Sequence, residues 1–170
     1  MKSVLLSGSA SVSGDGTFKL LSEAIDSIDS LMPGFRVIKV HGDHFDRAGA
    51  SIAQQLAFTL AGAVEYIDRL TDYGMDIDTV CRHMGFLFPA GSNYFTEIAK
   101  FRAARTLWAH IIESYGPGDE SSKIMHIEAE TSLWNKSIYD PYVNLIRGTV
   151  EAMAGIMGGV SSMTVFPFNY

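Results

Sequence analysis

The segment His126-Ile127-Glu128-Ala129-Glu130 alternates polar and apolar side chains. Successive side chains of an extended strand point to opposite faces, so this spacing predicts that His126, Glu128 and Glu130 share one face. An unpaired buried charge costs several kcal/mol. We therefore expect these side chains either to line a wet, ligand-binding interior or to form a hydrogen-bonded plug. Imidazole and carboxylates are usable metal ligands, but side chains two apart on a strand diverge and no second histidine lies nearby, which disfavours a metal.

A second polar cluster follows the predicted strand 37–41. It consists of His41, Asp43, His44 and Asp46. Barrel enzymes place functional groups directly after their strands, so a catalytic or metal-binding role is one interpretation. The other, which we favour, is a solvated loop in which Gly42 and Asp43 form a turn.

Composition and missing motifs exclude several classes of function. The formal charge of -6 and the absence of a basic run argue against a nucleic-acid partner. The single cysteine, Cys81, excludes an internal disulfide and suits a reducing compartment, so we expect a cytoplasmic protein. No stretch approaches the roughly 18 uninterrupted apolar residues of a membrane helix, so we expect no membrane segment. Glycine-rich nucleotide loops, a serine-nucleophile elbow and a His-Glu-x-x-His helix are all missing.

Short β-type segments alternate with long helical patterns, which predicts an α/β fold with parallel strands and right-handed crossovers. The predicted strands cover 37–41, 85–88, 123–130 and 163–166, and the predicted helices cover 50–73, 77–83, 94–115 and 141–157. The segment from Ser7 to Gly16 is predicted to be a flexible loop, with Asp15-Gly16 as a turn. Both a segment of a barrel and a doubly wound sheet satisfy this order of elements.

Helical spacing predicts which side chains face the core. For the helix over 50–73 these are Ile52, Leu56, Leu60, Val64, Ile67 and Leu70. For 94–115 they include Phe95, Phe101, Leu107 and Trp108, and for 141–157 they are Tyr142, Leu145, Ile146, Thr149, Met153 and Ile156. Three cations, Lys100, Arg102 and Arg105, could reach a CoA phosphate, but we favour a solvated or subunit-facing surface.

The most specific stretch runs from Gly91 to Gly159, where GSNYFTEIAKFRAARTLWAHIIESYG is followed by MHIEAETSLWNKSIYDPYVNLIRGTVEAMAGIMGG. It resembles the acyl-CoA-binding barrel of the methylmalonyl-CoA mutase family, and more closely the small, non-catalytic subunit than the large, catalytic one. The resemblance begins near Phe35 and continues to the end of the chain, whereas residues 1–34 match only loosely. It implies that residues 1–170 are part of a TIM (β/α)8 barrel, which needs about 200 to 250 residues when complete.

The resemblance also identifies positions where this chain departs from the catalytic members of the family. In those members the strand matching His126, Glu128 and Glu130 carries an Arg, a His and a Gln that hold the substrate, and the residue matching Thr164 is a His beside the reacting thioester. Two acids would repel a dianionic substrate, and threonine supplies neither an acid at neutral pH nor a cation. We therefore expect these four residues to line an altered pocket, with no catalytic residue and no metal ligand in the chain.

The resemblance implies a fragment of the small subunit of an adenosylcobalamin-dependent mutase that interconverts succinyl-CoA and methylmalonyl-CoA. Adenosylcobalamin belongs to the holoenzyme, and this chain alone is not expected to bind it, because the family's Asp-x-His-x-x-Gly signature is absent: Phe45-Asp46-Arg47-Ala48 follows His44. The expected partner is a homologous large catalytic subunit in a heterodimer, with acyl-CoA bound in the complex. The alternatives are a catalytic mutase of altered specificity, with Glu128 and Glu130 recognising the acyl group, and an unrelated α/β binding module. Half a barrel exposes strand edges, so we also expect association or poor solubility.

Overall fold

The computed structural model describes residues 6–7, 15–32 and 34–169 of the chain. Its strands are β1 (Leu6–Ser7), β2 (Ile38–His41), β3 (Met84–Ala90), β4 (Ile127–Thr131) and β5 (Ser162–Thr164). Its helices are α1 (Asp15–Leu31), α2 (Asp43–Arg47), α3 (Ile52–Asp72), α4 (Ile77–Arg82), α5 (Tyr94–Tyr115) and α6 (Pro141–Gly158), with a 3-10 turn, η1, at Glu120–Lys123.

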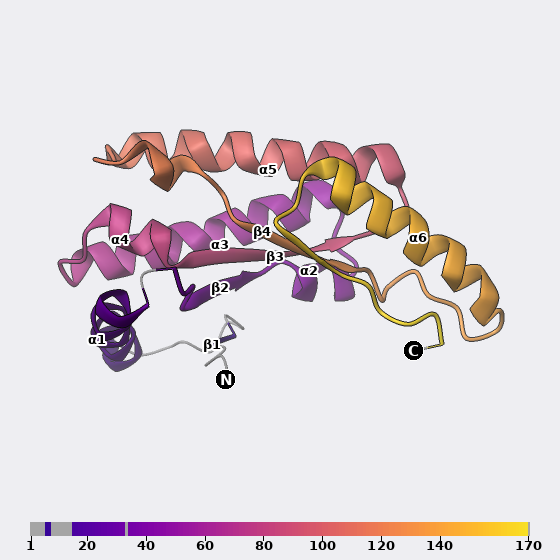
Figure 1. Ribbon diagram of the computed structural model, residues 1–170, viewed down its shortest axis with the longest axis horizontal. Helices are drawn as coiled ribbons and strands as arrows, with labels where there is room; N and C mark the ends of the chain where they lie inside the picture. Colours follow the sequence, from indigo (N-terminus) through magenta and orange to yellow (C-terminus); the bar gives the residue numbers. More distant parts are fainter. Residues whose placement is uncertain (1–5, 8–14, 33, 170) are drawn as a thin grey trace.

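The five strands form one parallel sheet in the order β1-β2-β3-β4-β5, so each strand pairs with its predecessor along the chain. The long helices α3, α5 and α6 lie on the same side of the sheet (Figure 1). A doubly wound sheet reverses its strand order at a switch point, whereas consecutive order is the pattern of a (β/α) barrel. The predicted α/β class is confirmed, and the strand order resolves the ambiguity in favour of part of a barrel.

The core lies between the sheet and these helices. Side chains of alternate strand positions, including Ile38, Val40, Phe86, Phe88 and Ile127, are buried there. They join the buried side chains of α3 and α5, with the indole of Trp108 edge-on to the ring of Phe86 at 4.8 Å between centroids. This apolar layer fixes the register of the strands, because a shift by one residue would turn every side chain to the other face.

Several predicted boundaries were wrong. Asp15-Gly16 is the start of α1 and not a turn, while residues 8–14 of the predicted flexible loop lie outside the described residues. The predicted solvated loop after β2 is the short helix α2. The predicted strand 123–130 begins too early, because Lys123 ends η1 and β4 starts only at Ile127.

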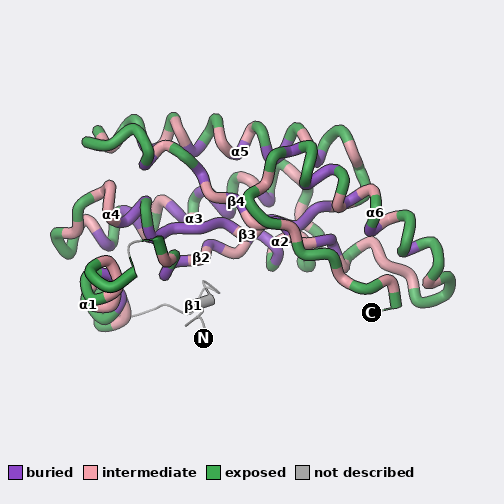
Figure 2. Tube along the Cα trace, viewed as in Figure 1, coloured by how far each residue is buried: buried purple, intermediate pink, exposed green. Residues whose placement is uncertain are grey.

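The burial predicted for α6 was also wrong. Its exposed side chains include Tyr142 (73%), Leu145 (51%), Ile146 (67%), Met153 (50%) and Ile156 (67%), and Figure 2 shows the exposed residues along this helix. The residues buried instead are small or polar: Asn144, Gly148, Glu151, Ala154, Gly155 and Gly158. Small residues let two helices approach closely, and here they take precedence over burial of the larger apolar side chains.

Helix α5 differs from its predicted pattern at several positions, including Leu107, which was predicted to face the core and is 44% exposed. Phe95, predicted to face the core, is 81% exposed, whereas Lys100, predicted to face solvent or a subunit, is 2% exposed. The buried ammonium of Lys100 is accommodated because it donates to the carbonyl oxygen of Pro89 (2.5 Å) and to Oε1 of Gln55 (3.2 Å) and pairs with Glu97. Among the described residues, no helix is both long and apolar enough to cross a membrane.

Replacing Gly158 with alanine is expected to destabilise the protein. A Cβ atom at Gly158 would lie 2.6 Å from Cδ2 and 3.0 Å from Cβ of Phe101, so α6 and α5 would have to move apart. We expect Gly158→Ala to lower the free energy of unfolding by about 1–3 kcal/mol. Urea denaturation monitored by circular dichroism measures the change.

The matched control lies in the same helix. A Cβ atom at Gly148 meets no atom within 4 Å. Alanine has the higher helix propensity, so Gly148→Ala should raise the free energy of unfolding by about 0.5–1 kcal/mol. Equal effects of the two substitutions would show that the contact with Phe101 does not limit the packing of α6.

The exposed apolar stripe on α6 is expected to drive self-association of the isolated chain, because contiguous apolar patches favour contact with another surface. Replacing Ile146 and Ile156 together with lysine should weaken this association by about tenfold or more. Sedimentation velocity at several concentrations measures it, and Thr106→Lys on the exposed side of α5 is the control. A wild-type chain that remains monomeric at all concentrations would contradict the prediction.

Candidate functional site

The face of the sheet opposite the helices carries the polar side chains that alternate with the core residues. Residues paired in register form three rows across the strands of this face. Lys39 lies beside Gly85 in the first row. The second row is His41, Leu87, Glu128 and Ser162, and the third is Pro89, Glu130 and Thr164. We call this surface the inner face, because it corresponds to the interior of a closed barrel. The predicted alternation of β4 is confirmed, with Ile127 and Ala129 buried and Glu128 and Glu130 half-buried.

Glu128 is paired within the chain. Its Oε2 lies 2.5 Å from Nζ of Lys39 on β2, and about a quarter of each side chain is exposed. The signal for this partner is present in the sequence, because Lys39 and His41 alternate with Ile38 and Val40 just as the acids alternate on β4. The ammonium group cancels the charge that Glu128 would otherwise present to a ligand.

Glu130 is paired with α2. Nη2 of Arg47 lies 3.2 Å from Oε1 of Glu130 and 3.2 Å from Oδ2 of Asp43, so one guanidinium group joins two carboxylates. Burial raises the pKa of Glu130, and the nearby charge of Asp43 raises it further, while Arg47 opposes both effects. The sequence around Arg47 does not reveal its place in this site, since nothing local to residue 47 indicates a partner on β4.

His126 and Thr164 are less engaged. His126 immediately precedes β4, and burial lowers the pKa of its imidazole, with the positive charges of Arg36 and Lys39 adding to the effect. Thr164 is exposed on β5, beside Glu130 in the register. The inner face therefore brings Glu128, Glu130 and Thr164 into neighbouring positions, with His126 at the end of the face where β4 begins.

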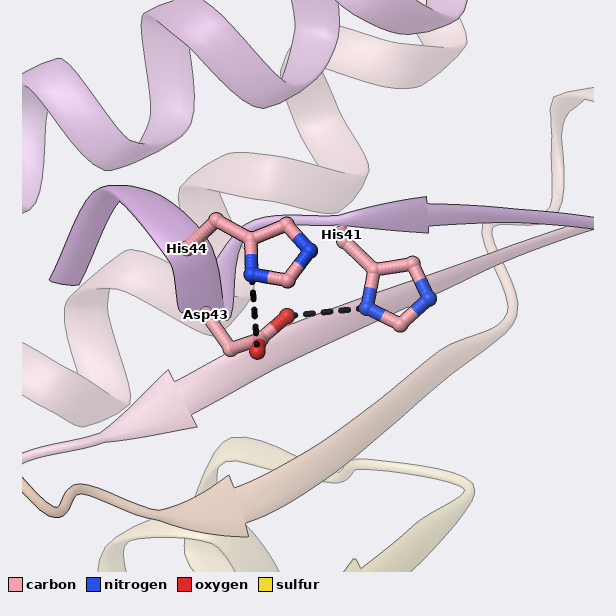
Figure 3. A group of neighbouring side chains, drawn as sticks. All are labelled: His41, Asp43 and His44. Atoms are coloured by element: carbon pink, nitrogen blue, oxygen red, sulfur yellow. Dashed lines mark hydrogen bonds and ion pairs between the residues drawn. The ribbon is translucent and has the colours of Figure 1, made fainter. Parts of the chain in front are cut away.

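His41, Asp43 and His44 meet at the corner where β2 passes into α2 (Figure 3). Nδ1 of His41 is 2.9 Å from Oδ1 of Asp43, and Nδ1 of His44 is 3.5 Å from Oδ2. The two imidazole rings stack, with centroids 5.1 Å apart. Asp43 is 4% exposed. Burial alone would raise the pKa of its carboxyl group, but the hydrogen bond from His41 and the charges of His44, His41 and Arg47 together lower this pKa.

Asp46, the fourth residue of this cluster, points elsewhere. Its carboxylate accepts hydrogen bonds from Nε2 of Gln55 (3.1 Å) and from Oγ of Ser132 (2.7 Å). Gln55 in turn accepts from Lys100. Asp46 therefore links α2, α3 and the end of β4, and it has a structural role.

Asn144 and Arg147 make similar links. Nδ2 of Asn144 donates to the carbonyl oxygens of Ser137 (2.8 Å) and Phe168 (3.1 Å), and Nη1 of Arg147 donates to Oδ1 of Asn144 (3.0 Å). These contacts hold the segments on either side of α6. They place no charged group on the inner face.

The comparisons with known proteins identify the family. The sequence pattern described as methylmalonyl-CoA mutase matches residues 1–169. The chain belongs to the methylmalonyl-CoA mutase family. Its resemblance to that family, inferred from residues 91–159, is thereby confirmed.

Several methylmalonyl-CoA mutases match the chain, one of them named as a small subunit. It is 44% identical over 160 residues to the methylmalonyl-CoA mutase small subunit of Porphyromonas gingivalis, covering 93% of this chain and 26% of that protein. It is 35% identical to the methylmalonyl-CoA mutase of Escherichia coli over 153 residues and to the mitochondrial human enzyme over 154 residues, covering 90% of this chain in each case. The chain thus spans only about a fifth to a quarter of the length of these relatives.

The raised pKa of Glu130 predicts a pH dependence of stability. A carboxyl group with a higher pKa in the folded state favours folding below its unfolded pKa, and this contribution is lost as the pH rises through the folded pKa. Replacing Glu130 with glutamine removes that dependence. We expect the free energy of unfolding of Glu130→Gln, relative to wild type, to increase between about pH 4 and pH 7.

Urea denaturation at a series of pH values tests this prediction. The exposed pair of Glu65 and Arg69 on α3 provides a control, since loss of an exposed ion pair in Glu65→Gln should cost less than about 1 kcal/mol. A relative stability of Glu130→Gln that falls with rising pH would mean that the ion pair with Arg47 outweighs the burial of the carboxylate.

Proposed function

We propose that this chain forms part of the barrel of a small mutase subunit and supports a homologous catalytic subunit without catalysing the reaction itself. The observation that carries the proposal is the internal pairing of the inner-face acids. Lys39 neutralises Glu128, and Arg47 neutralises Glu130. A dianionic succinyl thioester requires cations that remain free to bind it, and here Lys39 and Arg47 are already paired with the chain's own carboxylates.

The pairing changes the physical argument made from sequence. Glu128 and Glu130 were expected to repel the substrate through their charge. With Lys39 and Arg47 beside them, the face is closer to neutral, and its polar groups satisfy one another. The resulting surface resembles the hydrogen-bonded plug more than the ligand-lined interior, which suits a supporting role.

The position of Thr164 also supports this role. The family resemblance assigns a histidine beside the reacting thioester to this position. Thr164 is exposed on β5 and provides a hydroxyl group that neither protonates nor carries a charge at neutral pH. Proton transfer or charge stabilisation at this point of a barrel would have to come from another residue.

The partner in this proposal is a large subunit of the same family, and the assembled enzyme converts succinyl-CoA to methylmalonyl-CoA in the cytoplasm. Adenosylcobalamin supplies the radical chemistry when it is bound in such an enzyme. The residues present here do not fit a cobalamin site, because the family's signature is absent and His44 has its Nδ1 turned toward the carboxylate of Asp43. We therefore place the cofactor on another part of the assembly.

Activity measurements with the complete small subunit test the proposal. With succinyl-CoA and adenosylcobalamin, we expect no turnover by the small subunit alone and turnover by its complex with the large subunit. Introducing Thr164→Ala into the small subunit should change kcat/KM of the complex by less than about threefold, because the hydroxyl group contacts no reacting atom.

Two outcomes would contradict this role. One is turnover by the small subunit without its partner. The other is acyl-CoA binding to the small subunit alone that is lost on Glu130→Gln, which would instead favour a catalytic mutase of altered specificity. Calorimetric titration with succinyl-CoA separates the second outcome from loss of folding, provided that circular dichroism of the variant is unchanged.

A further inference from the structure

His41, Asp43 and His44 gather three side chains of metal-ligand type at one corner of the fold. One ligand atom from each residue lies within 4.8 Å of the other two. His41 ends β2, and Asp43 and His44 open α2, so all three come from one short segment. The interpretation favoured from sequence, a solvated loop, does not describe this corner, since the carboxylate of Asp43 is buried between the imidazoles.

The spacing is close to that of a bound ion. Tetrahedral ligands at about 2.0–2.1 Å from a zinc ion are about 3.3–3.4 Å apart. Nδ1 of His44 lies 3.5 Å from Oδ2 of Asp43, near this value, whereas Nδ1 of His41 lies 2.9 Å from Oδ1, at hydrogen-bond distance. Small side-chain movements would therefore bring the three residues around an ion. His44 can adjust to an ion by side-chain rotation, because 42% of its side chain is exposed.

The corner is held in place by close backbone packing. Gly42 donates its N–H to the carbonyl oxygen of Leu87 at 2.8 Å. A Cβ atom at Gly42 would lie 2.7 Å from Oγ1 of Thr59 and 3.0 Å from the carbonyl oxygen of Leu87. This contact fixes the direction in which β2 turns into α2, so His41 and Asp43 face each other before any ligand binds, which is the preorganisation a binding site requires.

The local charge suits a divalent cation. The two carboxylates of Asp43 and Glu130 outnumber the one guanidinium group of Arg47 that contacts them. Arg47 is half exposed and also contacts Glu130 at 3.2 Å. Arg47 can therefore lose its contact with Asp43 when a metal ion binds and keep its contact with Glu130.

The hydrogen bonding of His41 leaves one ring nitrogen without a partner. Nε2 of His41 is buried, and the described residues provide it with no hydrogen-bond partner. A neutral imidazole carries its proton on one nitrogen, and the carboxylate of Asp43 selects Nδ1 because it can only accept a hydrogen bond. Nδ1 carries the proton while it donates to the carboxylate of Asp43 at 2.9 Å. A metal ion bound at Nδ1 displaces that proton, which can be held at Nε2 without breaking a hydrogen bond.

We propose that His41, Asp43 and His44 form a binding site for a divalent first-row metal ion, with Zn²⁺ as the ion that two imidazoles and a carboxylate fit best. Three protein ligands leave at least one coordination position for water or another group. The site lies at the carboxyl end of β2, at the edge of the inner face. It is independent of the supporting role proposed above, since it concerns binding of an ion to this chain alone.

Metal titration of the purified, tag-free protein tests the site after treatment with a chelator. Calorimetry with ZnCl₂ should show one bound ion per chain, and CoCl₂ should give visible d–d absorption typical of four-coordinate cobalt. His44→Gln should weaken Zn²⁺ binding by at least about tenfold, because a ligand is lost while the exposed position preserves the fold. Asp43→Asn should weaken it further.

The matched control is His110→Gln, which removes an exposed histidine of α5 and should bind Zn²⁺ as tightly as wild type. Circular dichroism confirms that each variant is folded. The proposal is overturned if wild type binds no stoichiometric ion, or if His44→Gln binds Zn²⁺ as tightly as wild type. Because the readouts are binding and absorption, failure of this site leaves the proposed supporting role untouched, and the reverse also holds.

Discussion

The pairing of acids on β4 with cations from β2 and α2 is the interaction on which the inner face depends. Helices cover one face of the parallel sheet, so the polar residues of the other face must find partners beside them in the register. Lys39 and Arg47 supply those partners for Glu128 and Glu130. Because each pair joins different elements, it also ties α2 and β2 to β4, although ion pairs of this exposure contribute little net stability. Their main effect is to determine which charges remain available to a ligand.

On the face of the sheet that the helices cover, charged groups are also paired within the chain, and there they are fully buried. Lys100 and Glu97 form an ion pair beneath the carboxyl end of β3, and Glu151 of α6 is held by Asn135 at 2.7 Å and Lys136 at 2.6 Å. Burial raises the pKa of Glu151, and its partners oppose that effect. Removing one member of such a pair leaves an uncompensated buried charge, which costs about 3–5 kcal/mol. Both sides of the sheet are thus organised by polar networks at its carboxyl edge, the edge where barrel proteins place their sites.

The sequence was sufficient to predict the α/β class, the long helices and the shared face of Glu128 and Glu130, because these depend on spacing within a single segment. It did not predict the partners of those acids, since Lys39 lies 89 residues from Glu128 and Arg47 lies 83 residues from Glu130. The strand order that favours a barrel is likewise a property of the assembled sheet. The corner at His41, Asp43 and His44 was recognised as a cluster, but its geometry depends on the contact of Gly42 with β3, which no local pattern encodes.

Helix α6 shows why amphipathic spacing alone misled the prediction of its buried face. Its sequence contains two stripes, one of large apolar side chains and one of small or polar ones, and periodicity favours the first. The structure buries the second, because Gly155 and Gly158 permit close approach to Met163 and Phe101, and because Glu151 must reach Lys136. The larger side chains then line an apolar groove of about 480 Å³ between α6 and residues 165–168. A helix whose small face meets its own sheet leaves its larger apolar face available to a further element, and this is the arrangement expected of one unit in a barrel built from repeating strands and helices.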